Sequence, residues 1–480
     1  MDLTAALHIA IPELILAVGA LALLATGAFA GDKYVRLIST AAVVVLCAAA
    51  IAAARAAYGS AFGGGFVSDS ATAYAKVAIY LLSAVGIVLG DPWLVRVKNS
   101  RFEYPVLILL AALGMGMMAS SGDLISLYIG VELFSLATYV LAAFQRDDAK
   151  SSEAGLKYFV LGALSSGILL YGASLVYGFS GSVRFTDIAF AVKGGTSAGV
   201  IFGLVFLICG LAFKVSAAPF HMWTPDVYEG APTPVVAFIG AAPKLAAMVL
   251  FARAVGQAFP GATHDWGQVV VAIGVISVTV GAFAGLVQKN LKRLLAYSSI
   301  ANIGYALIGL SAGTQEGVQS LFLFMTLYTI DVTGFFACLI ALQRSGKPIE
   351  RLEDFAGLIK TRPGIAFALT ALSLSVLGLP PFSGFWSKFF VFKAAIAGGQ
   401  TPAAVFALVM SVVAAFYYLR LIKTMWFDAP AGEAPDRSPL EARGVAYAAA
   451  LFSFPGVIPA LMLLEPAARL ASRAFPGLRP

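Results

Sequence analysis

The sequence predicts an all-α polytopic membrane protein. Of its 480 residues, 60% are hydrophobic and 12% are charged, whereas about a quarter of the residues of a soluble domain are charged. The apolar residues form about fourteen long runs, and a helix needs about 20 apolar residues to cross a bilayer. Prolines interrupt two of these runs at corresponding places. These observations predict about fourteen transmembrane helices, two of them broken.

The predicted spans follow one another without a large soluble insertion. They are centred near residues 18, 46, 82, 113, 133, 167, 208, 245, 277, 302, 331, 371, 411 and 454. The first run, residues 7–29, is too long for the apolar part of a signal peptide and has no basic segment before it, so it predicts a membrane helix. The longest polar connections, 344–362 and 427–443, are too short for a cofactor domain. We expect a single transmembrane domain over residues 1–480.

Nothing in the sequence predicts a cofactor or metal bound to this chain. Cys47, Cys209 and Cys338 stand singly in apolar runs, which excludes the spacings of iron–sulfur, zinc and disulfide sites. The sequence has neither a GxGxxG motif nor a P-loop, so we expect no nucleotide site. The formal net charge of +7 is dispersed, and we expect no nucleic-acid partner.

The distribution of Lys and Arg predicts the orientation. With fourteen spans, both ends of the chain share one side of the membrane. The connections on the opposite side hold 19 Lys and Arg residues, and those on the side of the ends hold nine, which include Lys76 and Arg253. Because basic connections stay in the cytoplasm, we expect both termini on the outer, periplasmic side. The alanine-rich composition favours a bacterial inner membrane.

Six ionisable residues fall within predicted spans, where a charge costs at least about 2.5–3.5 kcal/mol. They are Glu132, Lys157, Lys214, Lys244, Asp331 and Lys388. Such residues are functional candidates by default. Lys157 has an alternative role in an i,i+4 pair with Glu153, and Asp331 in hydrogen bonds to nearby hydroxyls. His221, about two helical turns after Lys214, is either a further candidate or a structural histidine.

Two broken helices predict an internal repeat. Pro219 follows Lys214 in "FKVSAAPFHMW", and Pro381 precedes Lys388 in "GLPPFSGFWSKFF". Proline removes a helix hydrogen bond, and membranes tolerate such breaks only where protein or water satisfies the freed groups. The two prolines are 162 residues apart, which is typical of repeated halves. We predict two inverted five-helix repeats, helices 4–8 and 9–13, with helices 7 and 12 broken. The expected divisions are three N-terminal helices in 1–100, the repeats in 101–260 and 265–428, and a C-terminal helix in 440–480.

Five stretches of the sequence are distinctive: "DLISLYIGVELFSLATYVLAAF", "EAGLKYFVLGALSSGILLYGASLVYG", "FKVSAAPFHMWTPDVYEGAPTPVVAFIGAAPK", "LKRLLAYSSIANIGYALIGL" and "GLPPFSGFWSKFF". They resemble the antiporter-like, Mrp-related membrane subunits of NADH:quinone oxidoreductase, respiratory complex I, and subunit N most closely. The third stretch is highly specific to this group. The resemblance covers about residues 65–430.

The resemblance implies a proton relay through Glu132, Lys214, Lys244 and Lys388, with Glu132 and Lys214 as a switchable ion pair. Two unit charges 4 Å apart interact by about 4 kcal/mol at an effective dielectric constant near 20, so separating the pair would push the proton onward. Lys157 and His221 also match family positions. Asn302 and Asp331 depart from the family pattern.

The resemblance also implies that the chain is a translocase subunit without a redox centre of its own. FMN, iron–sulfur clusters and quinone are expected in partner subunits, and the expected contacts are other antiporter-like and small membrane subunits and the lipid bilayer. Three alternatives stay open: a subunit of a multisubunit Na⁺/H⁺ antiporter, a membrane subunit of an energy-converting hydrogenase, and a proton-inert scaffold. The six buried charges argue against the scaffold.

Overall fold

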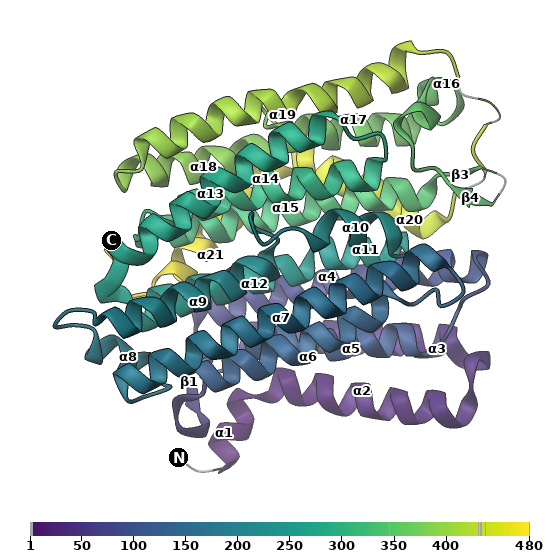
Figure 1. The fold of residues 1–480 in the computed structure, drawn as a ribbon. Coiled ribbons are helices and arrows are strands. Elements are labelled where there is room, and N and C mark those ends of the chain that lie inside the picture. Colours follow the sequence, from purple (N-terminus) through teal and green to yellow (C-terminus); the bar gives the residue numbers. More distant parts are fainter. Residues whose placement is uncertain (1–2, 345, 431, 433, 437, 480) are drawn as a thin grey trace.

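The computed structural model is a bundle of long helices running side by side, and it describes residues 3–479 except 345, 431, 433 and 437 (Figure 1). Eleven helical segments in this part of the chain are long and apolar enough to cross a membrane. The shorter α5 (Glu103–Ala119) and α17 (Pro363–Leu377), with the 20-residue α14 (Leu291–Leu310), bring the crossings to fourteen. The all-α polytopic fold is confirmed.

The other crossings combine full-length helices with helices built from two segments. They are α2 (Ile11–Ala30), α3 (Val35–Arg55), α4 (Ser70–Arg96), α6 (Leu124–Ala142), α7 (Ala149–Ser180), α9 (Ala198–Val215) with α10 (Trp223–Gly230), α11 (Thr233–Gly240) with α12 (Ala242–Ala258), α13 (Thr263–Leu286), α15 (Gln315–Ala341), α19 (Thr401–Phe427), and α20 (Leu440–Leu451) with α21 (Val457–Ser472). The second half of the α17 crossing is α18 (Ser383–Ala397).

Short elements fill the connections, and the sequence analysis predicts none of them. They are α1 (Leu3–Ile9), α8 (Phe185–Ala191), α16 (Leu358–Thr361), the antiparallel pair β1 (Gly59–Ala61) and β2 (Phe66–Ser68), and the antiparallel pair β3 (Gln343–Arg344) and β4 (Lys347–Pro348).

Two crossings form the centre of the bundle. The most apolar part of α11–α12 is entirely buried and that of α15 is 94% buried, whereas α2 and α20–α21 are mostly exposed. Lys244 lies on α12 and Asp331 on α15. These two charges are therefore surrounded by protein rather than lipid.

Both predicted helix breaks are present and correspond to each other. The helix α9 ends at Val215, and Ser216 takes a left-handed conformation with φ +67°. The helix α17 ends at Leu377, and Gly378 takes the same kind of conformation with φ +96°. Ser216 and Gly378 are 162 positions apart, the same interval that separates Pro219 from Pro381. This match supports the predicted repeats, whose boundaries stay a prediction.

A third break lies in the last crossing and corrects the single helix expected over 440–480. The π-helical turn Phe452–Gly456, which contains Pro455, separates α20 from α21. The helix α21 ends at Ser472. Proline has no backbone N–H to donate, which accounts for the interruption at this point.

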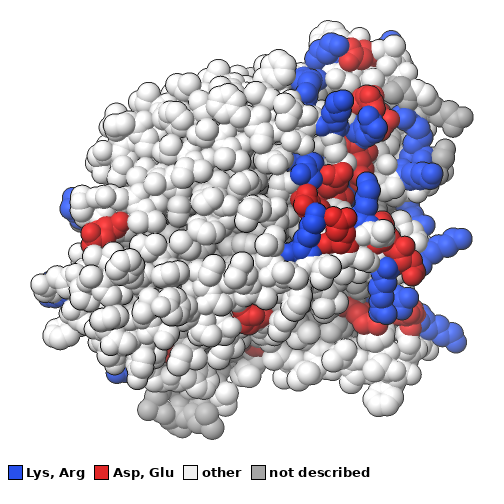
Figure 2. Space-filling view, viewed as in Figure 1, with Lys and Arg blue, Asp and Glu red and all other residues white. Residues whose placement is uncertain are grey.

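Charged side chains gather at one end of the bundle (Figure 2). They occupy the end opposite to the one where both ends of the chain lie (Figures 1 and 2). The wide band between the two ends is almost free of charge on the face shown. This pattern is that of a protein with an apolar belt in contact with lipid tails.

Candidate functional site

Lys214 lies in the last turn of α9, directly before the first break, and its side chain is buried. Its amine donates to Ser135 Oγ at 3.0 Å, Ser166 Oγ at 3.2 Å and Tyr139 Oη at 3.4 Å. Ser135 and Tyr139 belong to α6, and Ser166 belongs to α7. Three hydroxyl groups from two neighbouring helices therefore surround this lysine.

Glu132 lies on α6, one turn before Ser135. Residues three, four and seven positions apart share one face of a helix, so Glu132 follows the same face as Ser135 and Tyr139. One of its carboxylate oxygens is buried without a hydrogen-bond partner, and Glu132 is in no ion pair with the described residues. The structure thus holds the predicted Glu132–Lys214 pair apart, with Ser135 bonded to the lysine.

Lys244 is the third residue of α12 and is buried in the centre of the molecule. Its amine donates a hydrogen bond to the Ser299 hydroxyl of α14. The amine also lies 5.3 Å from the ring centre of Tyr228, on α10. The ring face attracts a cation, so this lysine has one hydroxyl and one aromatic neighbour.

Lys388 lies on α18, just after the second break, and is also buried. Its amine donates to the backbone oxygen of Leu377 at 2.9 Å and to Ser411 Oγ of α19 at 2.8 Å. The ring centre of Tyr305, on α14, is 4.9 Å away. The lysine therefore reaches back across the break to the last carbonyl of α17.

The three lysines share one kind of environment. Each is hydrogen-bonded to a hydroxyl and lies near an aromatic ring. Among the described residues, none of the three forms an ion pair with a carboxylate. A buried charge without a counter-ion is costly, so this shared arrangement indicates a function rather than a contribution to stability.

Other buried cations contrast with these lysines, and two of them correct the sequence analysis. Lys76 and Arg253, which it placed in connections, are buried inside α4 and α12. Lys76 pairs with Glu13 at 2.5 Å, and Arg253 pairs with Asp69 at 2.8 Å. Burial raises the pKa of Asp69, but the charge and hydrogen bond of Arg253 together with the hydrogen bonds from Thr72 hold the pKa below its usual value.

The remaining candidates lie apart from the three lysines. The side chain of Lys157 is 42% exposed and pairs with Glu153 at 2.7 Å, as the i,i+4 alternative predicts, and with Asp226 at 2.8 Å. His221 is half-buried in the first break, and its Nδ1 has no hydrogen-bond partner among the described groups. Asp331 is buried against serine hydroxyls around the second break.

The elements between the lysines form a continuous sequence of contacts. The ring of Tyr158 on α7 packs edge-on against Tyr139 at 4.8 Å and stacks on Trp223 of α10 at 4.4 Å. The helix α10 packs against α14. On α14, Ser299 contacts Lys244 and Tyr305 contacts Lys388. Ser299 and Tyr305 are six residues apart, which corresponds to about 9 Å along the helix. These contacts give the order Lys214, Lys244, Lys388 across the molecule.

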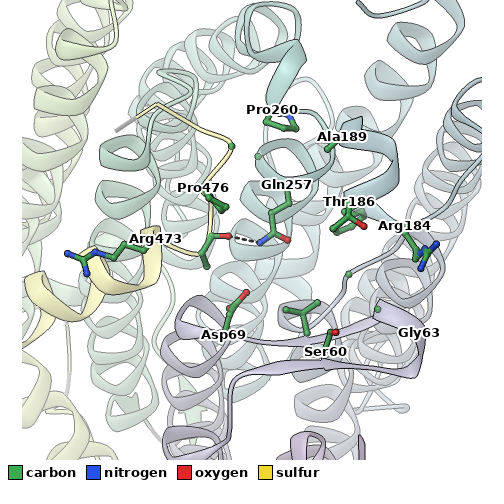
Figure 3. Close-up of a pocket in the computed structure, with 17 residues that line it drawn as sticks. Ser60, Gly63, Asp69, Arg184, Thr186, Ala189, Gln257, Pro260, Arg473 and Pro476 are labelled. Carbon is green, nitrogen blue, oxygen red and sulfur yellow. Dashed lines mark hydrogen bonds between the residues drawn. The ribbon is translucent and has the colours of Figure 1, made fainter. Parts of the chain in front are cut away.

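A cavity of about 960 Å³ opens at the end of the bundle where the chain termini lie (Figure 3). Its walls include Ser60, Asp69, Thr186 and Arg473. Gln257 closes one side by donating to the backbone oxygen of Ala474 at 2.9 Å. The three buried lysines do not line this cavity, but α12, which carries Lys244, ends at its wall.

The chain is similar to known proteins over most of its length. Residues 121–414 match the family described as NADH:quinone oxidoreductase/Mrp antiporter, TM. NADH-quinone oxidoreductase subunit N of Caulobacter sp. (strain K31) is 68% identical over 392 residues, which cover 80% of this chain and 81% of the relative.

Two solved structures share the fold. A chain of respiratory complex I from Thermus thermophilus with bound aureothin has a TM-score of 0.82 and 34% identity, with 96% of this chain and 99% of that chain covered. A chain of the Mrp complex from Dietzia sp. DQ12-45-1b has a TM-score of 0.86 at 24% identity, with 98% of each chain covered, and shows likeness of fold alone. The chain therefore belongs to the antiporter-like subunit N family of NADH-quinone oxidoreductase.

Proposed function

We propose that this chain carries protons across the membrane within NADH-quinone oxidoreductase, through Glu132, Lys214, Lys244 and Lys388. The observation that carries the proposal is the shared environment of the three lysines: they are buried, bonded to hydroxyls and without a carboxylate partner in the described part of the chain. A carboxylate at ion-pair distance would hold the ammonium in place. Hydroxyls both donate and accept hydrogen bonds, so they can receive a proton from a lysine and pass it on.

Glu132 and Lys214 are assigned the switching step. Glu132 lies about one helical turn from Ser135 on α6, and Ser135 is hydrogen-bonded to the lysine. When the carboxylate approaches the amine, their attraction of about 4 kcal/mol at 4 Å holds a proton on Lys214. When it withdraws, as in the structure, the proton is free to move toward Lys244 and Lys388.

Electron transfer is assigned to partner subunits that hold FMN, iron–sulfur clusters and quinone. The described residues contain no cluster of three His, Cys, Asp or Glu side chains placed to bind a metal. We expect the purified isolated chain to carry no flavin, haem or iron, as measured by its absorption spectrum and by metal analysis. Detection of a stoichiometric chromophore would contradict this assignment and indicate that this chain takes part in electron transfer itself.

The two ends of the bundle are assigned to the two sides of a bacterial inner membrane. The charge-rich end faces the cytoplasm, in keeping with its excess of Lys and Arg. Protons enter at that end, where Lys157, Asp226 and Arg293 form a partly exposed group of ion pairs. They leave at the opposite end, where the cavity of Figure 3 provides an opening to the periplasm.

The proposal is tested by removing one unpaired lysine and, as a matched control, one paired lysine. Lys244→Met is expected to slow proton translocation in vesicles that contain the reconstituted complex, after normalisation to assembled complex. The control replaces both members of the buried pair, Lys76→Met with Glu13→Leu; replacing both members of such a pair by apolar groups is often nearly neutral. Normal translocation in Lys244→Met would favour the proton-inert scaffold.

A further inference from the structure

Asp331 is a buried acid that the proposed relay does not use. It lies in the middle of α15 and is 1% exposed. Among the described residues it forms no ion pair. Its contacts lead instead to the second broken helix, whose two halves are α17 and α18.

The carboxylate of Asp331 bonds to a serine on each side of the break. Ser375, near the end of α17, donates to Oδ2 at 2.6 Å. Ser383, the first residue of α18, lies 3.0 Å from both carboxylate oxygens. The backbone N–H of Gly384 donates to Ser375 Oγ at 2.9 Å. Ser453, in the π-helical turn of the last crossing, lies 3.0 Å from Ser383.

The hydrogen bonds of this cluster are complete with Asp331 acting only as an acceptor. A serine hydroxyl has one proton to donate. Ser375 uses its proton on Asp331, and Ser383 uses its own either on Asp331 or on Ser375, whose hydroxyl lies 2.8 Å away. Ser453 can use its proton on Ser383, and Gly384 uses its N–H on Ser375. No proton from Asp331 is required. A group in such a place holds its neighbours in position rather than exchanging a proton with them.

The cluster fixes the position of the backbone oxygen that accepts a hydrogen bond from Lys388. This oxygen belongs to Leu377, two residues after Ser375, and the Lys388 amine donates to it at 2.9 Å. The fit is close, because a Cβ added to Gly378 would lie 3.0 Å from Lys388 Cδ. A change in the separation of Ser375 and Ser383 would therefore displace Leu377 O from the amine.

We propose that Asp331 is a positioning residue for Lys388: by binding Ser375 and Ser383, it fixes both ends of the second break so that the Leu377 carbonyl meets the lysine. The inference rests on the proposed role of Lys388 in proton transfer. It also explains why α15 carries a charge at this position, where the chain departs from the pattern of the family it resembles.

The first test compares Asp331→Asn with Asp331→Leu in the reconstituted complex, normalised to assembled complex. The asparagine amide oxygen has two lone pairs and can accept both serine hydroxyls, so translocation is expected near the wild-type rate. Leucine offers no acceptor, and a misplacement of this kind is expected to slow translocation by at least about tenfold. Equal slowing in both variants would overturn the proposal and make Asp331 a proton carrier. A normal rate in Asp331→Leu would also overturn it.

The second test asks whether Asp331 acts through Lys388. Asp331→Leu should cause no further loss in a Lys388→Met background, because residues that act through one another are non-additive. Independent losses would overturn the proposal. Thr329→Val is the matched control on α15, since the hydrogen bonds of the Thr329 hydroxyl to described groups all go to carbonyls of its own helix. A normal rate in Lys388→Met would overturn the role of Lys388 itself, whereas a slow Lys388→Met with a normal Asp331→Leu would overturn this inference alone.

Discussion

At the scale of single residues, the partner rather than the burial distinguishes one lysine from another. Lys76 and Lys244 are both buried. Lys76 has the carboxylate of Glu13 at 2.5 Å, whereas Lys244 has the hydroxyl of Ser299 and the ring of Tyr228. The ion pair of Lys76 joins two helices, whereas the proposal requires the proton of Lys244 to be free to leave. The two roles predict different responses to substitution.

Arginine substitution separates proton carriers from lysines that only need a charge. Lys244→Arg and Lys388→Arg are expected to assemble but to slow proton translocation, because arginine stays protonated. Lys393→Arg should be almost silent, since Lys393 is 59% exposed and only forms an ion pair with Glu316. The measurement is proton uptake into vesicles. Normal translocation in Lys244→Arg together with slow translocation in Lys393→Arg would show that the proposed relay contains the wrong lysines.

Glu132→Gln tests the switching step. Glutamine keeps the shape of the side chain but removes the charge, so Lys214 loses the only acid that the proposal assigns to it. We expect an assembled complex in which proton translocation and the quinone reductase activity coupled to it both fall. An assembled Glu132→Gln complex that pumps at the wild-type rate would remove Glu132 from the relay.

At the scale of helices, the sequence predicts where two crossings break but not how each break is held. Pro219 and Pro381 indicate the breaks, because a proline interrupts a helix wherever it lies. The left-handed conformation of Ser216 carries no comparable sequence signal. Asp331 could be recognised as a buried charge, but its partners Ser375, Ser383 and Ser453 belong to separate elements. Only the packing of these elements shows what the charge does.

Gly378→Ala tests the geometry of the second break. An alanine in the left-handed conformation costs about 1–2 kcal/mol, and its Cβ would also press on Lys388 Cδ. We expect a lower thermal midpoint and slower proton translocation. Gly399→Ala is the matched control, because Gly399 has φ +85° but open space around the added Cβ. It should lower the midpoint while leaving translocation unchanged; an equal loss of translocation in both variants would contradict the assigned role of the break.

At the scale of the whole molecule, the apolar runs and the distribution of Lys and Arg along the sequence predict the bundle, the number of crossings and the end that carries most charge. Fourteen apolar runs correspond to fourteen crossings, and the charge-rich end is evident in Figure 2. The assignment failed for Lys76 and Arg253, which stand close enough to the ends of their runs to be counted as connections. Their acids, Glu13 and Asp69, come from other helices or from a helix start, so a window of local sequence does not show the pairing.

Cysteine labelling tests the orientation of the bundle. In a variant in which Cys47, Cys209 and Cys338 are replaced, one new cysteine is introduced at exposed Lys193 or at exposed Lys289. These positions lie in connections at opposite ends of the bundle. Lys193→Cys should react with a membrane-impermeant maleimide added outside intact cells, and Lys289→Cys only after the membrane is opened. The reverse labelling pattern would contradict the proposed orientation and place the charge-rich end on the periplasmic side.

The helix breaks have an electrostatic consequence. A helix segment ends in carbonyl groups that together act as about half a negative charge, and it begins with N–H groups that act as about half a positive charge. Lys214 lies in the last turn of α9, and Lys388 binds the last carbonyl of α17, so each rests at the negative pole of a half-helix. Lys244, the third residue of α12, lies instead at a positive pole. In the proposed relay, a proton would therefore be favoured at Lys214 and Lys388 and disfavoured at Lys244, so that it would be held at the outer two lysines and pass quickly through the central one.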